Sequence, residues 1–313
     1  MRSSGRSGVV RRWRPSRICP VSARGSVASR TSMDGIAHEE GRMTGKARRL
    51  HRLFRLPGSR ALVIPIDHVV SMGAVDGLDD LSAVVRCAAE GGATAVIGHR
   101  GGLGQAFDRL GMPLVERLAL VLQLSGATNL SPEPTRHRLI CSVDEAVRSG
   151  ADAVSVQVNF GCRRETEMLG GLARVVRDAE RVCLPVIVMA YVRDERGTID
   201  LTPERVVHAA RVAAELGADA IKVPFAGAET IDWMTRIVPA PVLVAGGGKD
   251  NHATFMAVCR EALAAGARGL CVGRNVFQSS DPMAVLADLH AMLCGDEAGT
   301  RVTSAVGRCW KDA

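Results

Sequence analysis

Short apolar stretches rich in β-branched residues recur along most of the chain. Eight of them can be distinguished, and their starts lie 21 to 35 residues apart. Each is a continuous apolar run rather than an alternating one, which is typical of strands buried on both faces and therefore parallel. They span residues 61–67, 93–99, 118–124, 153–159, 185–191, 219–224, 240–246 and 269–273.

Between most of these stretches lies a helical pattern that ends in glycine, as in PERVVHAARVAAELGA and FMAVCREALAAGA. The recurring order of helix, Gly-Ala and strand is typical of a βα unit. Eight such units predict a single-domain α/β protein, a closed (β/α)8 barrel. An open, doubly wound sheet is disfavoured because the first strand is followed by DHVVSMG instead of a glycine-rich dinucleotide fingerprint. Near the third unit, RLICS (138–142) leaves room for an additional strand.

Both ends of the chain depart from this repeat. Residues 1–43 are rich in Arg, Ser and Gly and lack apolar periodicity, so we expect a disordered basic extension. Its composition fits either an organellar transit peptide or a translation start at Met33 or Met43. We expect the barrel over residues 44–295, opened by a short amphipathic helix in KARRLHRLFRL, and a C-terminal tail over 296–313.

Composition excludes several other classes of function. The net charge of +7 is concentrated in residues 1–32, which hold eight arginines and no acid, and aromatic residues form only 3% of the chain. We therefore expect no nucleic-acid partner. The apolar runs are too short to span a bilayer, so no membrane association is expected. The nine cysteines show neither CxxC pairs nor zinc spacing, as in a reduced cytoplasmic protein.

Lys222 is the most distinctive candidate for chemistry. The chain contains four lysines against 36 arginines, and this lysine lies inside an apolar strand between Ile221 and Val223. A lysine enclosed by apolar neighbours can lose its proton and attack a carbonyl, which an arginine cannot do. The alternative is a lysine that extends from a strand end into solvent. We predict a nucleophile.

Two further strand ends carry groups that can move protons, and barrel active sites lie at the carboxyl ends of strands. Tyr191, the only tyrosine, ends the strand before the one bearing Lys222. Its phenol could exchange protons with a reacting substrate, or merely complete the packing of the rim. Asp67 closes the first strand and could accept a proton, or could cap a turn or helix.

Glycine-rich loops after the last two strands predict a phosphate site. GGGK (246–249) follows the seventh strand and GRN (273–275) follows the eighth. Barrels often bind phosphate with these two loops, where glycine lets backbone N–H groups approach an anion and Arg274 adds charge. Each glycine run alone could be a tight turn.

A metal site has weaker support. His68 and His99 close neighbouring strands, but no third histidine closes a predicted strand. Zinc usually takes three protein ligands in a catalytic site. We therefore expect neither a metal nor another cofactor.

Several stretches together resemble the archaeal-type class I aldolase family, from about Arg49 to Asp288. They read VIPIDHVVSMGAVDGL, VLQLSGATNLSPEP, VDEAVRSGADAVSVQVNFG, VVHAARVAAELGADAIKV, PAPVLVAGGGK and VGRNVFQ. The family includes 2-amino-3,7-dideoxy-D-threo-hept-6-ulosonate synthases and class I fructose-bisphosphate aldolases. The resemblance implies homo-oligomers, commonly decamers.

The resemblance also implies roles for individual residues. Lys222 would form a Schiff base with a phosphorylated keto-sugar, Tyr191 would donate a proton and Asp67 would accept one. In the synthase, the resulting enamine attacks aspartate 4-semialdehyde on a route toward aromatic compounds. The substrate contacts implied are Asp67, His68, Val69, Val70, Ser71, Tyr191, Val192, Arg193, Gly246, Gly247, Gly273 and Arg274.

Departures from the family pattern keep the substrate open. HKG is replaced by HRG at 99–101, MYPRG by AYVRD at 190–194, and TSYTG by VPFAG at 223–227, with loss of hydroxyl groups. Besides the synthase, we consider a fructose-bisphosphate aldolase, a thiolase-type acyltransferase acting on a phosphorylated signal molecule, and a non-catalytic barrel that binds a phosphorylated metabolite.

Overall fold

The computed structural model describes residues 44–194 and 196–295. The predictions made for residues 1–43 and 296–313 lie outside the described residues.

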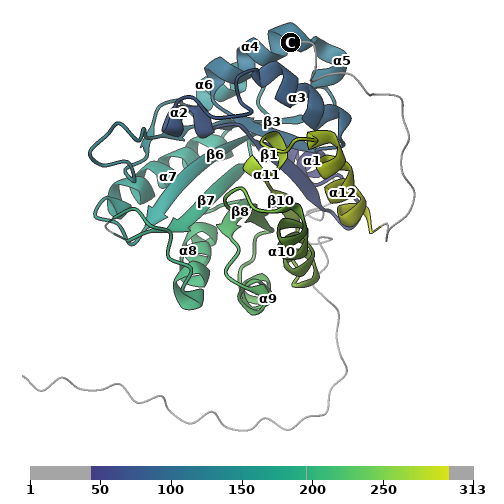
Figure 1. Cartoon of the computed structure of the whole chain (residues 1–313). Helices are drawn as coiled ribbons and strands as arrows, with labels where there is room; N and C mark the ends of the chain where they lie inside the picture. The colour runs from purple at the N-terminus through teal and green to yellow at the C-terminus, as the bar shows by residue number, and fades with distance from the viewer. Residues whose placement is uncertain (1–43, 195, 296–313) are drawn as a thin grey trace, which may run out of the picture.

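Eight parallel strands form a closed barrel with helices around it (Figure 1). Their order around the barrel is β1-β10-β9-β8-β7-β6-β3-β2. This confirms the predicted fold, and each barrel strand falls within or next to one of the eight apolar stretches. The strands are β1 Ala61–Pro65, β2 Ala95–Gly98, β3 Ala119–Gln123, β6 Ala153–Phe160, β7 Val186–Val192, β8 Ala220–Pro224, β9 Val242–Ala245 and β10 Gly269–Cys271.

A long excursion from the barrel, residues 124–152, separates β3 from β6. It contains β4 (Ser125–Gly126) and β5 (Arg138–Leu139), which pair antiparallel outside the barrel. The additional strand considered for residues 138–142 is therefore present as β5, but it does not enter the barrel.

The helices begin with signals that are readable in the sequence. Ser142 and Glu145 form a capping box at the start of α6, and the Asp80 carboxylate accepts two backbone N–H bonds at the start of α3. In the described ranges, no helix is long and apolar enough to cross a membrane. The helices are α1 Gly45–Leu53, α2 His68–Met72, α3 Leu81–Glu90, α4 Arg100–Leu110, α5 Met112–Val115, α6 Val143–Arg148, α7 Glu165–Glu180, α8 Pro203–Glu215, α9 Ala228–Ile237, α10 His252–Ala264, α11 Arg274–Phe277 and α12 Pro282–Cys294.

The barrel interior is a separate apolar cluster that includes the amphipathic helix predicted before the first strand. Leu50 and Leu53 of α1, with Phe54, pack against inward-facing strand residues such as Ile187 and Met189. These three side chains close the amino-terminal end of the barrel, so that the interior is open to ligands from the carboxyl end.

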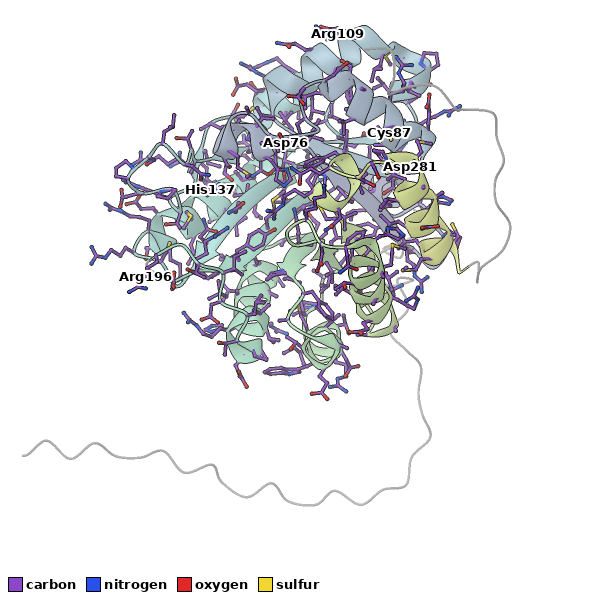
Figure 2. All side chains as sticks on the ribbon, viewed as in Figure 1. Asp76, Cys87, Arg109, His137, Arg196 and Asp281 are labelled. Carbon is purple, nitrogen blue, oxygen red and sulfur yellow. The ribbon has the colours of Figure 1, made fainter. Side chains whose placement is uncertain are left out.

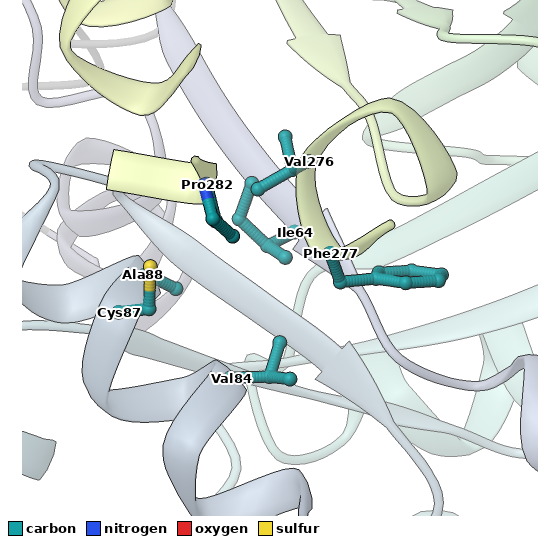
Figure 3. Close-up of a pocket in the computed structure, with 7 residues that line it drawn as sticks. All are labelled: Ile64, Val84, Cys87, Ala88, Val276, Phe277 and Pro282. Atoms are coloured by element: carbon teal, nitrogen blue, oxygen red, sulfur yellow. The ribbon is translucent and has the colours of Figure 1, made fainter. Parts of the chain in front are cut away.

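Outward-facing strand residues pack against the surrounding helices in the larger apolar cluster. A small apolar space remains where β1 meets α3, α11 and α12, and it has no room for a water molecule (Figure 3). It is lined by Ile64, Val84, Cys87, Ala88, Val276, Phe277 and Pro282. We attribute this space to imperfect packing and not to ligand binding.

Candidate active site at the carboxyl end of the barrel

A cavity of about 470 Å³ opens at the carboxyl ends of the strands. Its lining brings together most of the residues that the sequence singled out. Lys222 and Tyr191 contribute side chains from strands β8 and β7, and Asp67 follows β1. The predicted anion loops, with Gly246, Gly247, Gly273 and Arg274, form the wall after β9 and β10.

Lys222 lies inside the barrel and not at a solvent-exposed strand end. It is only 6% exposed, and it pairs in register with Met189 of β7 and Leu243 of β9, which both face the interior. A side-chain hydrogen bond joins it to Cys271 of β10. This placement contradicts the alternative of a lysine extending into solvent.

Opposing effects act on the pKa of Lys222. Burial lowers the pKa, and the attraction of Cys271, Tyr191 and Asp67 raises it, so that the pKa lies above its ordinary value when all three are ionised. Burial also raises the pKa of Cys271, so this thiol is uncharged at neutral pH and does not attract the ammonium form of Lys222. Because burial is the largest single effect on the pKa of Lys222, we infer that it favours the unprotonated, nucleophilic amine once the attraction of an ionised Cys271 is absent.

Tyr191 lies one inward-facing position closer to the mouth than Lys222. Its neighbour Met189 is paired with Lys222, and Tyr191 itself is paired with Asn159 of β6. The Arg193 guanidinium lies over the phenol ring, 5.7 Å from its centroid. The ring is thereby held at the cavity wall, where its hydroxyl can serve a substrate bound to the amine.

Asp67 immediately precedes α2 but makes no side-chain hydrogen bond to that helix. The alternative role as a helix cap is therefore contradicted, and the carboxylate lines the cavity. The imidazole of His68 lies beside it, with 3.7 Å between Oδ1 of Asp67 and Nδ1 of His68. Burial lowers the pKa of His68, against the attraction of Asp67, and Lys222 and Arg274 lower it further. The lowered pKa favours a neutral imidazole at His68.

The anion loops are held together by Asn275, which the sequence analysis included in the GRN loop without giving it a role. Asn275 donates from Nδ2 to the carbonyls of Gly246 (2.9 Å) and Gly248 (2.8 Å), and its Oδ1 accepts from the N–H of Asp250 at 2.9 Å. The Nε atom of Arg274 is buried there without a hydrogen-bond partner. Fixed loops with an unpaired guanidinium nitrogen suit a phosphate oxygen.

Not every predicted contact faces the cavity. His68, Ser71 and Arg193 line it, whereas Val69, Val70 and Val192 are not part of the lining. Val192 alternates with the inward-facing Tyr191 and packs in the outer cluster, because successive residues of a strand point to opposite faces. The contact implied for Val192 therefore does not involve its side chain in this structure.

The excursion after β3 and the turn after β7 supply residues that sequence reasoning missed. Thr135, His137 and Arg196 line the cavity, and Figure 2 places His137 and Arg196 at the end toward which β6 and β7 point. His137 does not close a strand, so a search confined to strand ends could not find it. The available signal was the unusual length of this segment, because long structured loops often carry function.

Within the ranges described, there is no group of three or more His, Cys, Asp or Glu side chains that could hold an ion. Burial lowers the pKa of His99, and this residue is not part of the cavity lining.

The sequence of the chain is similar to those of known aldolases and synthases. A model of the DeoC/LacD family of aldolases matches residues 61–279. The chain is 36% identical, over 253 residues, to the 2-amino-3,7-dideoxy-D-threo-hept-6-ulosonate synthase of Halobacterium salinarum, which covers 80% of this chain and 92% of the relative. It is 33% identical to the 2-amino-4,5-dihydroxy-6-oxo-7-(phosphonooxy)heptanoate synthase of Streptomyces griseus, over 81% of this chain and 91% of the relative.

A solved structure also matches. It is an archaeal fructose-1,6-bisphosphate aldolase whose catalytic lysine is covalently bound to the carbinolamine intermediate of the substrate. The match has a TM-score of 0.72 and 31% identity, and it covers 80% of this chain and all of that one. Barrel, buried amine and relatives agree on an enzyme that makes or breaks carbon–carbon bonds, and the chain belongs to the DeoC/LacD family of aldolases.

Proposed function

We propose that this protein is a class I synthase that transfers part of a phosphorylated keto-sugar to aspartate 4-semialdehyde through a Schiff base on Lys222. The observation that carries the proposal is the buried amine of Lys222, placed in one cavity with the phenol of Tyr191 and the anion loops. The similarity to the two heptulosonate-type synthases supports the choice of acceptor.

The donor half of the reaction begins at Lys222. Its unprotonated amine attacks the ketone, and the carbinolamine hydroxyl leaves as water after Tyr191 protonates it. Asp67 then accepts the proton of the sugar hydroxyl beside the bond that breaks. An aldehyde leaves, and the electron pair of that bond forms the enamine. The phosphate is held by backbone N–H groups of the anion loops and by Arg274.

The acceptor half runs the same chemistry in reverse. The enamine carbon attacks the aldehyde carbon of the acceptor. The aldehyde oxygen becomes negatively charged and takes the proton that Asp67 accepted in the donor half. Water then adds to the imine carbon, and the product leaves with Lys222 restored as a free amine. All proton transfers use side chains of the cavity.

A class I fructose-bisphosphate aldolase is the second candidate. It is favoured by the match to the aldolase structure with a carbinolamine-bound lysine. The two candidates share the donor half, so the products distinguish them. Cleavage of fructose 1,6-bisphosphate to two triose phosphates supports the aldolase, and an aminated seven-carbon product from aspartate 4-semialdehyde supports the synthase. An acyltransferase would acetylate coenzyme A instead.

Borohydride trapping tests the shared mechanism. The protein is incubated with dihydroxyacetone phosphate or fructose 1,6-bisphosphate, reduced, digested and analysed by mass spectrometry. We expect a reduced adduct on Lys222 in the wild type and none in Lys222→Ala, with unchanged circular dichroism. The matched control is Lys46→Ala, which removes a lysine from α1 at the other end of the barrel, where it pairs with Asp219. An adduct on another lysine, or none with any ketose phosphate, contradicts the proposal.

We also propose a homo-oligomer in the cytoplasm. The resemblance to a family of homo-oligomers supports the assembly, and we assign the apolar side chains of Met112 and Leu130, 64% and 96% exposed, to a subunit contact. Cys141, Cys183 and Cys271 carry free thiols, as expected in a reducing compartment. Light scattering after size exclusion tests the assembly, and a monomeric mass contradicts it.

A further inference from the structure

The cavity has two opposite sides, and only one holds the anion loops. Those loops follow β9 and β10. In the closed order of eight strands, β6 stands four positions from β10 and β3 stands four positions from β9. The excursion between β3 and β6 therefore lies across the barrel from the anion loops, while β7 and β8, with Tyr191 and Lys222, occupy the arc between them.

His137 is held firmly in this excursion. Its N–H donates to the carbonyl of Thr135 at 3.2 Å, and the same carbonyl accepts from Asn159 Nδ2 of β6 at 2.6 Å. The next two residues form β5 and pair with β4. The Oδ1 atom of Asn159 also accepts from Arg193 Nε at 3.0 Å, which ties the excursion to the end of β7. These bonds fix the backbone that carries the ring before any substrate enters.

The imidazole of His137 lines the cavity with an unsatisfied hydrogen-bonding atom. Its Nδ1 is buried and has no partner. Burial, then the positive charge of Arg193, lowers the pKa of His137 to about 4, so the ring is neutral at physiological pH. A neutral imidazole offers one donor and one acceptor. Buried polar groups without partners are rare in proteins unless a ligand or water completes them.

Arg193 adds a charge to the same side. Burial lowers its pKa, and its guanidinium donates hydrogen bonds to the side-chain oxygen of Asn159 and the carbonyl of Gly197, both uncharged. Among the residues that the structure describes, no carboxylate forms an ion pair with it. A half-buried arginine without a counter-ion, beside a neutral imidazole, forms a pair suited to an oxyanion.

We propose that His137 is a specificity-determining residue that hydrogen-bonds an oxyanion, carboxylate or phosphate, on the acceptor aldehyde. The inference rests on the proposed function. With the donor phosphate in the anion loops and the donor carbonyl on Lys222, the new bond forms on the side away from those loops. The acceptor then extends toward His137 and Arg193.

The test separates the two halves of the reaction. The donor half is measured as the dihydroxyacetone phosphate concentration that gives half-maximal borohydride trapping at Lys222. The acceptor half is measured as kcat/KM with aspartate 4-semialdehyde, which carries a carboxylate, and with glyceraldehyde 3-phosphate. In His137→Phe we expect unchanged trapping and a loss of about tenfold in kcat/KM for the acceptor that the wild type prefers, mainly through KM. His137→Gln, which keeps a donor and an acceptor, should recover most of this loss.

The matched control is His208→Phe, on the exposed face of α8. It should change neither half. If trapping is normal in His137→Phe and kcat/KM stays within about twofold for both acceptors, the role of His137 is refuted while the proposed function stands. Equal losses in trapping and in kcat/KM, or no recovery in His137→Gln, also refute it. If the wild type itself shows no trapping, the proposed function fails.

Discussion

The clamp that Asn275 forms between the two anion loops leads to a quantitative prediction. Replacing Asn275 with Ala removes three hydrogen bonds, two to carbonyls of the glycine loop and one from Asp250 N–H. Net contributions of about 1 kcal/mol for each bond give a loss of about 3 kcal/mol in the free energy of unfolding, because Asn275 is buried and water cannot replace its amide. The loops should also lose their fixed spacing, which raises the ketose phosphate concentration needed for half-maximal trapping.

Urea denaturation at pH 7.5 and borohydride trapping measure the two effects on the same preparation. The matched control is Asn251→Ala, in the loop that leads into α10. Asn251 also makes side-chain bonds, to Thr254 and Asp250, but it is exposed. Its loss should cost about 1 kcal/mol, as expected for a helix cap, with no change in trapping. If Asn275→Ala is no less stable than Asn251→Ala and traps ketose phosphate as the wild type does, the clamp does not position the anion loops.

Two further predictions concern stability. The pKa of His137 lies at about 4 in the folded protein, below the value of about 6.5 in the unfolded chain, so falling pH protonates the unfolded state first. The free energy of unfolding should therefore drop by about 3 kcal/mol between pH 6.5 and pH 4 on account of this residue. Urea denaturation of His137→Gln across that range should show a correspondingly smaller drop than the wild type. If the free energy of unfolding falls equally with pH in both proteins, this prediction is wrong. In the same assay, Leu53→Ala should lower the free energy of unfolding by about 2 to 5 kcal/mol, because this side chain of α1 is 1% exposed and closes the barrel. A loss below about 1 kcal/mol would show that the packing of α1 against the barrel contributes little to stability.

The barrel could be predicted because its signals are local and repeated. Strands buried on both faces are continuous apolar runs, and each helix ends near a glycine, so the eight units stand out without any knowledge of contacts. The same rule located Lys222, because a lone amine inside such a run violates the pattern. Strand bounds were less certain, since β9 begins at Val242 and not at residue 240.

The other side of the site depended on long-range contacts that no local pattern encodes. His137 lines the cavity only because the fold brings together segments that are distant in sequence. Asn275 fixes the glycine loop because it donates to carbonyls about 28 residues earlier in the chain. Val192 illustrates the opposite error. It stands between two residues of the cavity wall, yet the alternation of the strand turns its side chain outward.

The solitary tyrosine has an experimental consequence. Since the chain contains no other phenol, its near-ultraviolet tyrosinate band can arise from Tyr191 alone. Absorbance difference spectra of the unmodified enzyme should therefore report ionisation at this one position, with and without ligand. The protein carries its own chromophore at the place where we expect protons to move.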